Sequence, residues 1–128
     1  MVLKKIIFTD DDPDIRNLIH ICLEDSGFTV ETCESGEETL KKIPLFKPDL
    51  IILDKYMPGM GGIRTLKIIQ EDKIYNSIPI VFLTAQSGKK EINTLLEYGA
   101  VDVIVKPFEP INFAAKIKEI WEQKIKSV

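Results

Sequence analysis

The segment LIILD, at residues 50–54, is a run of four apolar residues that ends in a carboxylate. A segment of the same kind, IIFTDD at residues 6–11, lies near the start of the chain. Short apolar runs of this length are typical of strands buried on both faces, as in parallel sheets. Ligands of open parallel sheets bind at the carboxyl ends of the strands, so the acids that end these two runs are expected to lie close together.

Short apolar runs alternate with longer segments of helical period along the whole chain. This order predicts an α/β fold in which a parallel sheet is covered on both faces. Strands are predicted at Lys5–Thr9, Thr29–Cys33, Asp49–Leu53, Ile80–Leu83 and Val101–Val105. Each strand is followed by a segment long enough for one helix, so five helices are expected.

Local signals give the helix ends. The first helix is predicted at about Pro13–Ser26, because its apolar residues share one face and Gly27 follows. Ser35 and Glu38 form a capping-box pattern for a second helix, which is expected to end before Pro44 and Pro48. The remaining helices are predicted to begin near Gly62, after turns at Gly59 and Gly61, near Gly88, and at Glu109-Pro110.

The 128 residues suit one domain, predicted over residues 1–128. With 17 basic and 20 acidic residues the net charge is −3, so neither direct nucleic-acid binding nor membrane binding is expected. No apolar stretch approaches the roughly 20 residues that cross a bilayer, and the N-terminus lacks the pattern of a signal peptide. These features favour a cytoplasmic location. Cys22 and Cys33 lack metal-ligand spacing and are predicted to be buried, reduced thiols.

Polar side chains end four of the five predicted strands. They are Asp10 and Asp11 after the first strand, Asp54 after the third, Thr84 after the fourth and Lys106 after the fifth. Carboxylates gathered at one sheet edge favour a hard cation such as Mg²⁺. A hydroxyl and an ammonium beside them can contact a phosphoryl group, so the sequence predicts a site that holds both.

The residue types suggest separate roles. Asp10 and Asp11 would supply oxygen ligands to Mg²⁺, directly or through water. Asp54 would be the nucleophile and form an acyl phosphate. Thr84 and Lys106 would offset the charge on the transferred phosphoryl oxygens.

Other charged residues are interpreted as structural. Asp12 and Asp14 are excluded from the metal ligands, since Asp14 suits the first turn of a helix. Lys55 and His20 are expected on the solvated surface, together with Lys89-Lys90.

The chain resembles a response-regulator receiver domain, the CheY-like family of two-component signalling, over essentially its whole length. The resemblance rests on FTDDDPDIR at residues 8–16, LDKYMPG at 53–59, FLTA at 82–85 and VKPF at 105–108. It implies a three-layer, flavodoxin-like, doubly wound fold with five parallel strands in the order 2-1-3-4-5 and five helices.

The resemblance also implies a function as a phosphoacceptor signalling domain. Asp54 would receive a phosphoryl group from a histidine kinase or phosphotransfer protein, and Mg²⁺ would be held by Asp11, Asp54 and the backbone carbonyl of Tyr56. Asp10 would act through water, and Lys106 would contact the phosphoryl oxygens with Thr84. The chain would catalyse only its own phosphorylation and dephosphorylation, and would control a downstream protein or effector domain through the face of its last two βα units. A cis peptide bond at Lys106-Pro107 is compatible with this family.

Three positions depart from the family or modify its site. Many receivers carry an aromatic residue three positions before the lysine, where this chain has Val103. Because a β-branched side chain has few rotamers, a signal is expected to travel through the loop after the fourth strand instead of a ring switch. Tyr56 and Gln86, each two residues after a site residue, are predicted to flank the mouth of the site, where the ring of Tyr56 would hinder attacking water.

Parts of the sequence are also compatible with other functions. A Mg²⁺-dependent aspartyl-phosphate phosphatase of the haloacid dehalogenase type is the main alternative, because Asp10 and Asp12 have its DxD spacing. Such enzymes need a larger core, and Asp14 stands where that motif expects Thr or Val. A flavin or nucleotide carrier is disfavoured because the loop after the first strand is acidic and lacks glycine. A receiver-like module that is never phosphorylated is disfavoured by the complete set of site residues.

Overall fold

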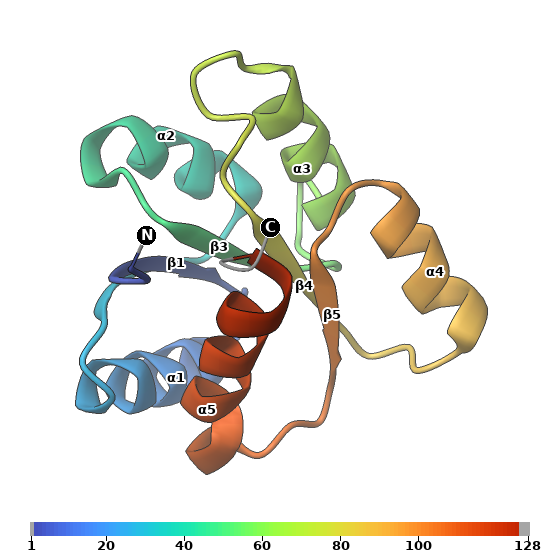
Figure 1. The fold of residues 1–128 in the computed structure, drawn as a ribbon. Helices are drawn as coiled ribbons and strands as arrows, with labels where there is room; N and C mark the ends of the chain where they lie inside the picture. The colour runs from blue at the N-terminus through green and yellow to red at the C-terminus, as the bar shows by residue number, and fades with distance from the viewer. Residues whose placement is uncertain (1, 126–128) are drawn as a thin grey trace.

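A five-stranded parallel sheet in the order β2-β1-β3-β4-β5 forms the centre of the computed structural model, which describes residues 2–125 (Figure 1). The elements are β1 (Lys5–Thr9), α1 (Pro13–Asp25), β2 (Thr29–Cys33), α2 (Gly36–Phe46), β3 (Leu50–Asp54), α3 (Gly62–Glu71), β4 (Ile80–Thr84), α4 (Lys89–Glu97), β5 (Asp102–Val105), α5 (Pro110–Ile120) and a final π-helical turn η1 (Trp121–Ile125). This confirms the predicted fold class, strand order and five helices.

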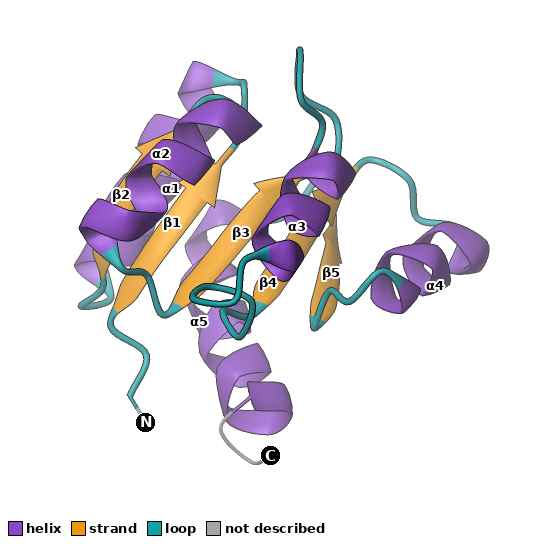
Figure 2. Cartoon of the chain, turned by 90° about the horizontal axis from the view of Figure 1, so that it is seen from above, coloured by secondary structure: helices purple, strands orange, loops and turns teal. Residues whose placement is uncertain are grey.

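Helices cover both faces of the sheet. Figure 2 shows α1 and α5 on one face and α2 and α3 on the other, with α4 beside β5. Successive residues of β1 point to opposite faces: Phe8 packs in the cluster formed with α1 and α5, whereas Ile7 packs in the cluster formed with α2, α3 and α4. The central strands are therefore buried on both sides, which explains their continuous apolar runs.

Two predicted strands end one residue too early. Asp54 is the last residue of β3 and pairs with Leu83, and Thr84 is the last residue of β4 and pairs with Val105. Both side chains are buried. The two residues therefore belong to the rigid ends of strands and not to the loops that follow.

The prediction that the second helix ends before Pro44 is wrong. α2 continues through Pro44 to Phe46, and Lys47 ends it with a left-handed φ of 55° while its N–H donates to the Ile43 carbonyl at 2.8 Å. Proline removes one helical hydrogen bond, but Pro44 is exposed, so water can solvate the carbonyl that loses its partner.

The predicted thiol environments are correct in part. Cys33 is buried, and burial raises the pKa of its thiol to about 11. Cys22 is only half-buried, because its helix face is shared between the core and solvent. Both cysteines are free. No helix among residues 2–125 is long and apolar enough to span a membrane. The domain predicted over residues 1–128 includes residues 1 and 126–128, which lie outside the described residues.

Candidate functional site

The carboxyl ends of β1, β3, β4 and β5 carry the predicted site residues. Backbone hydrogen bonds fix the first residues beyond β1 and β5 to the neighbouring strand in the sheet. The Asp10 N–H donates to the Cys33 carbonyl at 3.1 Å, and the Lys106 N–H donates to the Thr84 carbonyl at 2.7 Å. The side chains at this edge are therefore anchored by the sheet itself.

Asp10, Asp11 and Asp54 form a compact carboxylate cluster. One oxygen atom from each lies within 4.8 Å of the others. Asp10 and Asp54 are 0% and 5% exposed, whereas Asp11 faces solvent. The structure thus brings together the three acids that the sequence predicted, with one side of the cluster open.

Lys106 bridges the two buried acids. Its Nζ lies 2.7 Å from Asp10 Oδ2 and 2.9 Å from Asp54 Oδ2. Burial alone would lower the pKa of Lys106, but the hydrogen bonds to both carboxylates outweigh it and raise the pKa. The lysine therefore remains an ammonium and places one positive charge at the Asp54 carboxylate. Its bond to Pro107 is a cis peptide, as the family resemblance allows.

The Asp54 carboxyl group is electrostatically unfavourable in its charged form. Burial raises its pKa from the ordinary value of 3.8, and the charge of Asp10 adds to this, although Lys106 opposes both. The Tyr56 N–H donates to Asp54 Oδ1 at 3.3 Å, and this bond, like Lys106, lowers the pKa of Asp54. A cation bound beside Asp54 would thus stabilise a group that burial and its acidic neighbour destabilise.

Thr84 ends the strand next to β3. Its Oγ1 accepts a hydrogen bond from the Gln86 N–H at 3.1 Å. The Tyr56 hydroxyl donates to Gln86 Oε1 at 3.3 Å, so the loops after β3 and β4 meet above the site. The two residues predicted to flank the mouth are therefore in contact.

α3 begins very close to the end of β3. A Cβ atom placed on Gly62 would lie 2.4 Å from the Asp54 carbonyl oxygen and 2.9 Å from the Phe82 ring. The Gly62 N–H donates to the Lys55 carbonyl at 3.0 Å. Only glycine permits this approach, so Gly62 has a packing role in addition to the predicted turn.

The acidic loop after β1 contains one contributor that the sequence analysis missed. Arg16 donates from Nη1 to the Asp10 carbonyl at 2.8 Å and therefore holds the loop that carries Asp11. Its place in the first turn of α1, six residues after Asp10, was the available signal. Asp12 caps α1 by accepting from the Asp14 N–H at 2.9 Å, which agrees with its exclusion from the metal ligands.

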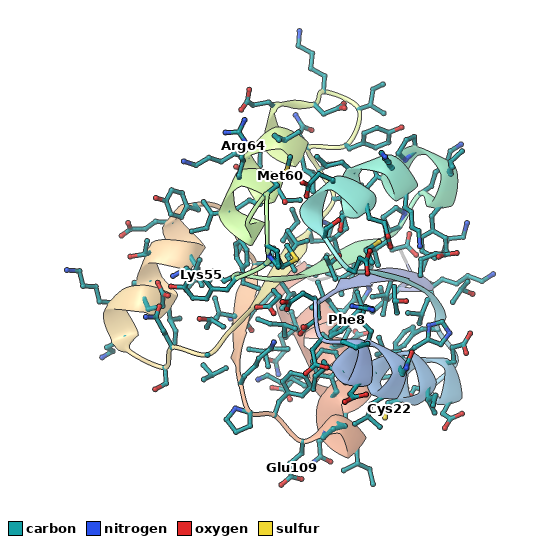
Figure 3. The ribbon with its side chains drawn as sticks, turned by 180° about the vertical axis from the view of Figure 1, so that it is seen from behind. Phe8, Cys22, Lys55, Met60, Arg64 and Glu109 are labelled. Carbon is teal, nitrogen blue, oxygen red and sulfur yellow. The ribbon has the colours of Figure 1, made fainter. Side chains whose placement is uncertain are left out.

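The prediction that Lys55 is solvated is wrong. Its side chain is only 12% exposed and forms an ion pair with Glu91 in the first turn of α4. In Figure 3 the labelled Lys55 extends towards α4. Lys89 and Lys90 are exposed as predicted, and His20 is partly exposed, 3.0 Å from Glu24 on the same helix.

The sequence and fold match known signalling proteins. A family model described as the response regulator receiver domain matches residues 6–118. The chain is 41% identical over 117 residues to the alkaline phosphatase synthesis transcriptional regulatory protein PhoP of Bacillus subtilis. The matched region covers 91% of this chain and 48% of PhoP. It is also 33% identical over 115 residues to the DNA-binding response regulator MtrA of Mycolicibacterium smegmatis. That matched region covers 90% of this chain and 49% of MtrA.

Solved structures agree with these matches. The structure of the chemotaxis response regulator CheY4 of Vibrio cholerae superposes with a TM-score of 0.86 at 30% identity, covering 93% of this chain and 99% of CheY4. The chain thus spans about half the length of the curated relatives it matches and nearly all of CheY4.

Proposed function

The chain belongs to the response regulator receiver domain family, and from this membership we propose that Asp54 accepts a phosphoryl group in the presence of Mg²⁺. The family supports a phosphoacceptor signalling role and not the haloacid dehalogenase-type phosphatase. The residue assignment rests on the ion pairs of Lys106 with both Asp10 and Asp54. These contacts bring three of the five predicted residues together.

In the proposed reaction, a carboxylate oxygen of Asp54 attacks phosphorus while the bond from phosphorus to the donor breaks, giving an acyl phosphate and the free donor. The Lys106 ammonium and the Thr84 hydroxyl would contact the phosphoryl oxygens and offset their charge. The same residues would later hold the acyl phosphate during its hydrolysis, so the chain would catalyse both of its own reactions.

The carboxylate cluster fits a Mg²⁺ ion. Three acids with oxygens within 4.8 Å of one another form a donor set of hard oxygens, and within residues 2–125 Lys106 is the one ammonium paired with them. Asp11, Asp54 and the Tyr56 carbonyl would hold the ion, with Asp10 acting through water. Bound Mg²⁺ would supply positive charge at the transferred phosphoryl group.

Incubation with acetyl phosphate and Mg²⁺, followed by intact mass measurement, tests this proposal. We expect one phosphoryl group on the wild-type chain and none on Asp54→Asn. Addition of EDTA before acetyl phosphate should prevent labelling. Equal labelling of Asp54→Asn would contradict the assignment of the acceptor.

Thermal unfolding tests the metal site independently of phosphorylation. Because Mg²⁺ would bind only the folded chain, a concentration ten times the dissociation constant should stabilise it by about 1.4 kcal/mol. This corresponds to an increase in Tm of about 4 to 6 °C for a domain of this size. Asp11→Ala should lose most of the increase, whereas Asp25→Ala, at an exposed acid on α1, should keep it. A melting curve that does not respond to Mg²⁺ would count against the site.

Tyr56 is proposed to lengthen the lifetime of the phosphorylated state. Its ring is 57% exposed at the mouth of the site and its hydroxyl is held by Gln86, so it can hinder the approach of water. We expect Tyr56→Ala to lose its phosphoryl group several times faster than the wild type, as timed by mass measurement. Leu45→Ala, at an exposed residue of α2, serves as a control. Unchanged or slower loss in Tyr56→Ala would contradict shielding.

We further propose a histidine kinase or phosphotransfer protein as phosphodonor, and a downstream partner that contacts α4, β5 and α5. The relatives PhoP and MtrA are about twice as long as this chain, and MtrA is described as DNA-binding. The absence of direct nucleic-acid contact by this chain, its cytoplasmic location and its extent as one domain over residues 1–128 stay predictions.

A further inference from the structure

α4 is attached to the rest of the molecule mainly at its two ends. Leu95 is the single buried residue of this helix. Just beyond the helix, the Tyr98 carbonyl accepts from Gln70 Nε2 at 2.8 Å, and Lys67 Nζ lies 4.8 Å from the centre of the Tyr98 ring. The first turn of α4 is attached through Glu91. Burial of one leucine contributes apolar stabilisation, and polar contacts at the two ends also help to fix the helix position.

The attachment of the first turn is a shielded ion pair between Lys55 and Glu91, whose side chains are 12% and 16% exposed. Burial alone would lower the pKa of Lys55, but the hydrogen bond to Glu91 outweighs it and raises the pKa. A pair shielded from water is stronger than an exposed one, because the local dielectric is lower. The N-cap of α4 is Gly88, which offers no side-chain capping bond, so the first turn depends more strongly on this pair.

The lysine of this pair directly follows the proposed phosphoacceptor. Its N–H donates to the Leu83 carbonyl at 2.8 Å and its carbonyl accepts from the Gly62 N–H at 3.0 Å, so its backbone is fixed to β4 and α3. Lys55 Nζ also donates to Gln86 Oε1 at 3.3 Å, and the Gln86 N–H donates to Thr84 Oγ1 at 3.1 Å. The first turn of α4 is therefore connected to the segments that carry Asp54 and Thr84.

We infer that Lys55 and Glu91 form a latch that holds the first turn of α4, and that a phosphoryl group on Asp54 loosens it by competing with Glu91 for the Lys55 ammonium. This inference rests on the proposed function. A phosphoryl group on Asp54 adds up to about two negative charges at the residue that directly precedes Lys55. The latch gives this chain a route from the site to α4 that needs no aromatic ring at Val103.

Linkage makes the latch testable from both directions. If a phosphoryl group weakens the latch by some factor, removal of the latch strengthens phosphoryl binding by the same factor. Beryllofluoride with Mg²⁺ is the probe, since it mimics a bound phosphoryl group without turnover. The proteins compared are the wild type, Glu91→Gln and the control Glu97→Gln, an exposed acid at the other end of α4.

We expect Glu91→Gln to bind beryllofluoride about five-fold more tightly than the wild type by calorimetric titration, a factor worth about 1 kcal/mol. Without ligand, amide exchange in residues 89–92 should be about five-fold faster in Glu91→Gln, with a smaller change near Tyr98. Beryllofluoride should accelerate the same amides in the wild type but not in Glu91→Gln. Glu97→Gln should follow the wild type in each measurement.

Two outcomes overturn the inference in distinguishable ways. If all three proteins bind beryllofluoride equally and show the same exchange in α4, the latch is absent while the proposed function stands. If the wild type and both variants fail to bind the probe and are not labelled by acetyl phosphate, the proposed function is wrong and the coupling falls with it.

Discussion

Lys106→Met is expected to slow phosphoryl transfer to Asp54 by about a hundred-fold, the effect typical of removing one donor that stabilises charge in a transition state. The ammonium is the only positive charge, among the described residues, bonded to both Asp10 and Asp54. If the ammonium is removed, the negative charge on the transferred phosphoryl group is repelled by two buried carboxylates that no longer share a cation. The rate is measured from the time course of the mass increase with acetyl phosphate and Mg²⁺.

The same substitution should destabilise the metal-free protein, because it leaves two buried acids without their shared cation. The cost is expected at roughly 1 to 3 kcal/mol, below that of a fully buried pair because Lys106 is 25% exposed. Mg²⁺ should restore much of this stability but not the rate. Lys116→Met, at an exposed lysine of α5, is the matched control. A labelling rate within two-fold of the wild type would refute the proposed role of Lys106.

Asp54→Asn is expected to stabilise the metal-free protein by roughly 1 to 2 kcal/mol at pH 7. Two carboxylates about 5 Å apart repel by roughly 3 kcal/mol at an effective dielectric of about 20, and Lys106 offsets part of this. The asparagine removes one of the two charges. Urea unfolding in EDTA measures the gain, with the exposed Glu119→Gln as control.

The gain should depend on pH in a defined direction. Burial raises the pKa of Asp54 above 3.8, so the folded chain binds its proton more tightly than the unfolded chain does. Between 3.8 and the folded-state pKa, this group makes the free energy of unfolding fall as pH rises. Asp54→Asn lacks that titration, so its advantage should be small at pH 4 and larger at pH 7. A gain that is equal at both values, or a loss, would show that Asp54 is not strained in this way.

The sequence was sufficient to predict the elements that position the site. Apolar runs in the segments around Phe8 and Ile52 were local signals of buried strands, and a parallel sheet places all their carboxyl ends at one edge. The proximity of Asp10, Asp54 and Lys106 follows from this topology and required no knowledge of the loops. Errors of one residue at Asp54 and Thr84 arose because polar residues can end a strand while still pairing in the sheet.

The missed contacts depend on tertiary placement. Lys55 and Glu91 are separated by 36 positions and meet only because α4 lies beside the loop after β3. In the sequence each resembles an ordinary surface charge. The prediction at Pro44 was wrong for a related reason. A local rule for proline takes no account of whether the carbonyl that loses its hydrogen bond can be solvated by water. The role of Arg16 likewise depends on the angle at which α1 leaves β1.

The contact of Gly62 with the end of β3 limits what a partner can detect. Since no side chain fits between this residue and the Asp54 carbonyl, the amino-terminal end of α3 is packed directly against β3. If Asp54 is phosphorylated as proposed, a partner that binds only this end would meet a backbone that keeps its place relative to β3. Discrimination between the two states must therefore come from parts of the molecule that can shift relative to β3.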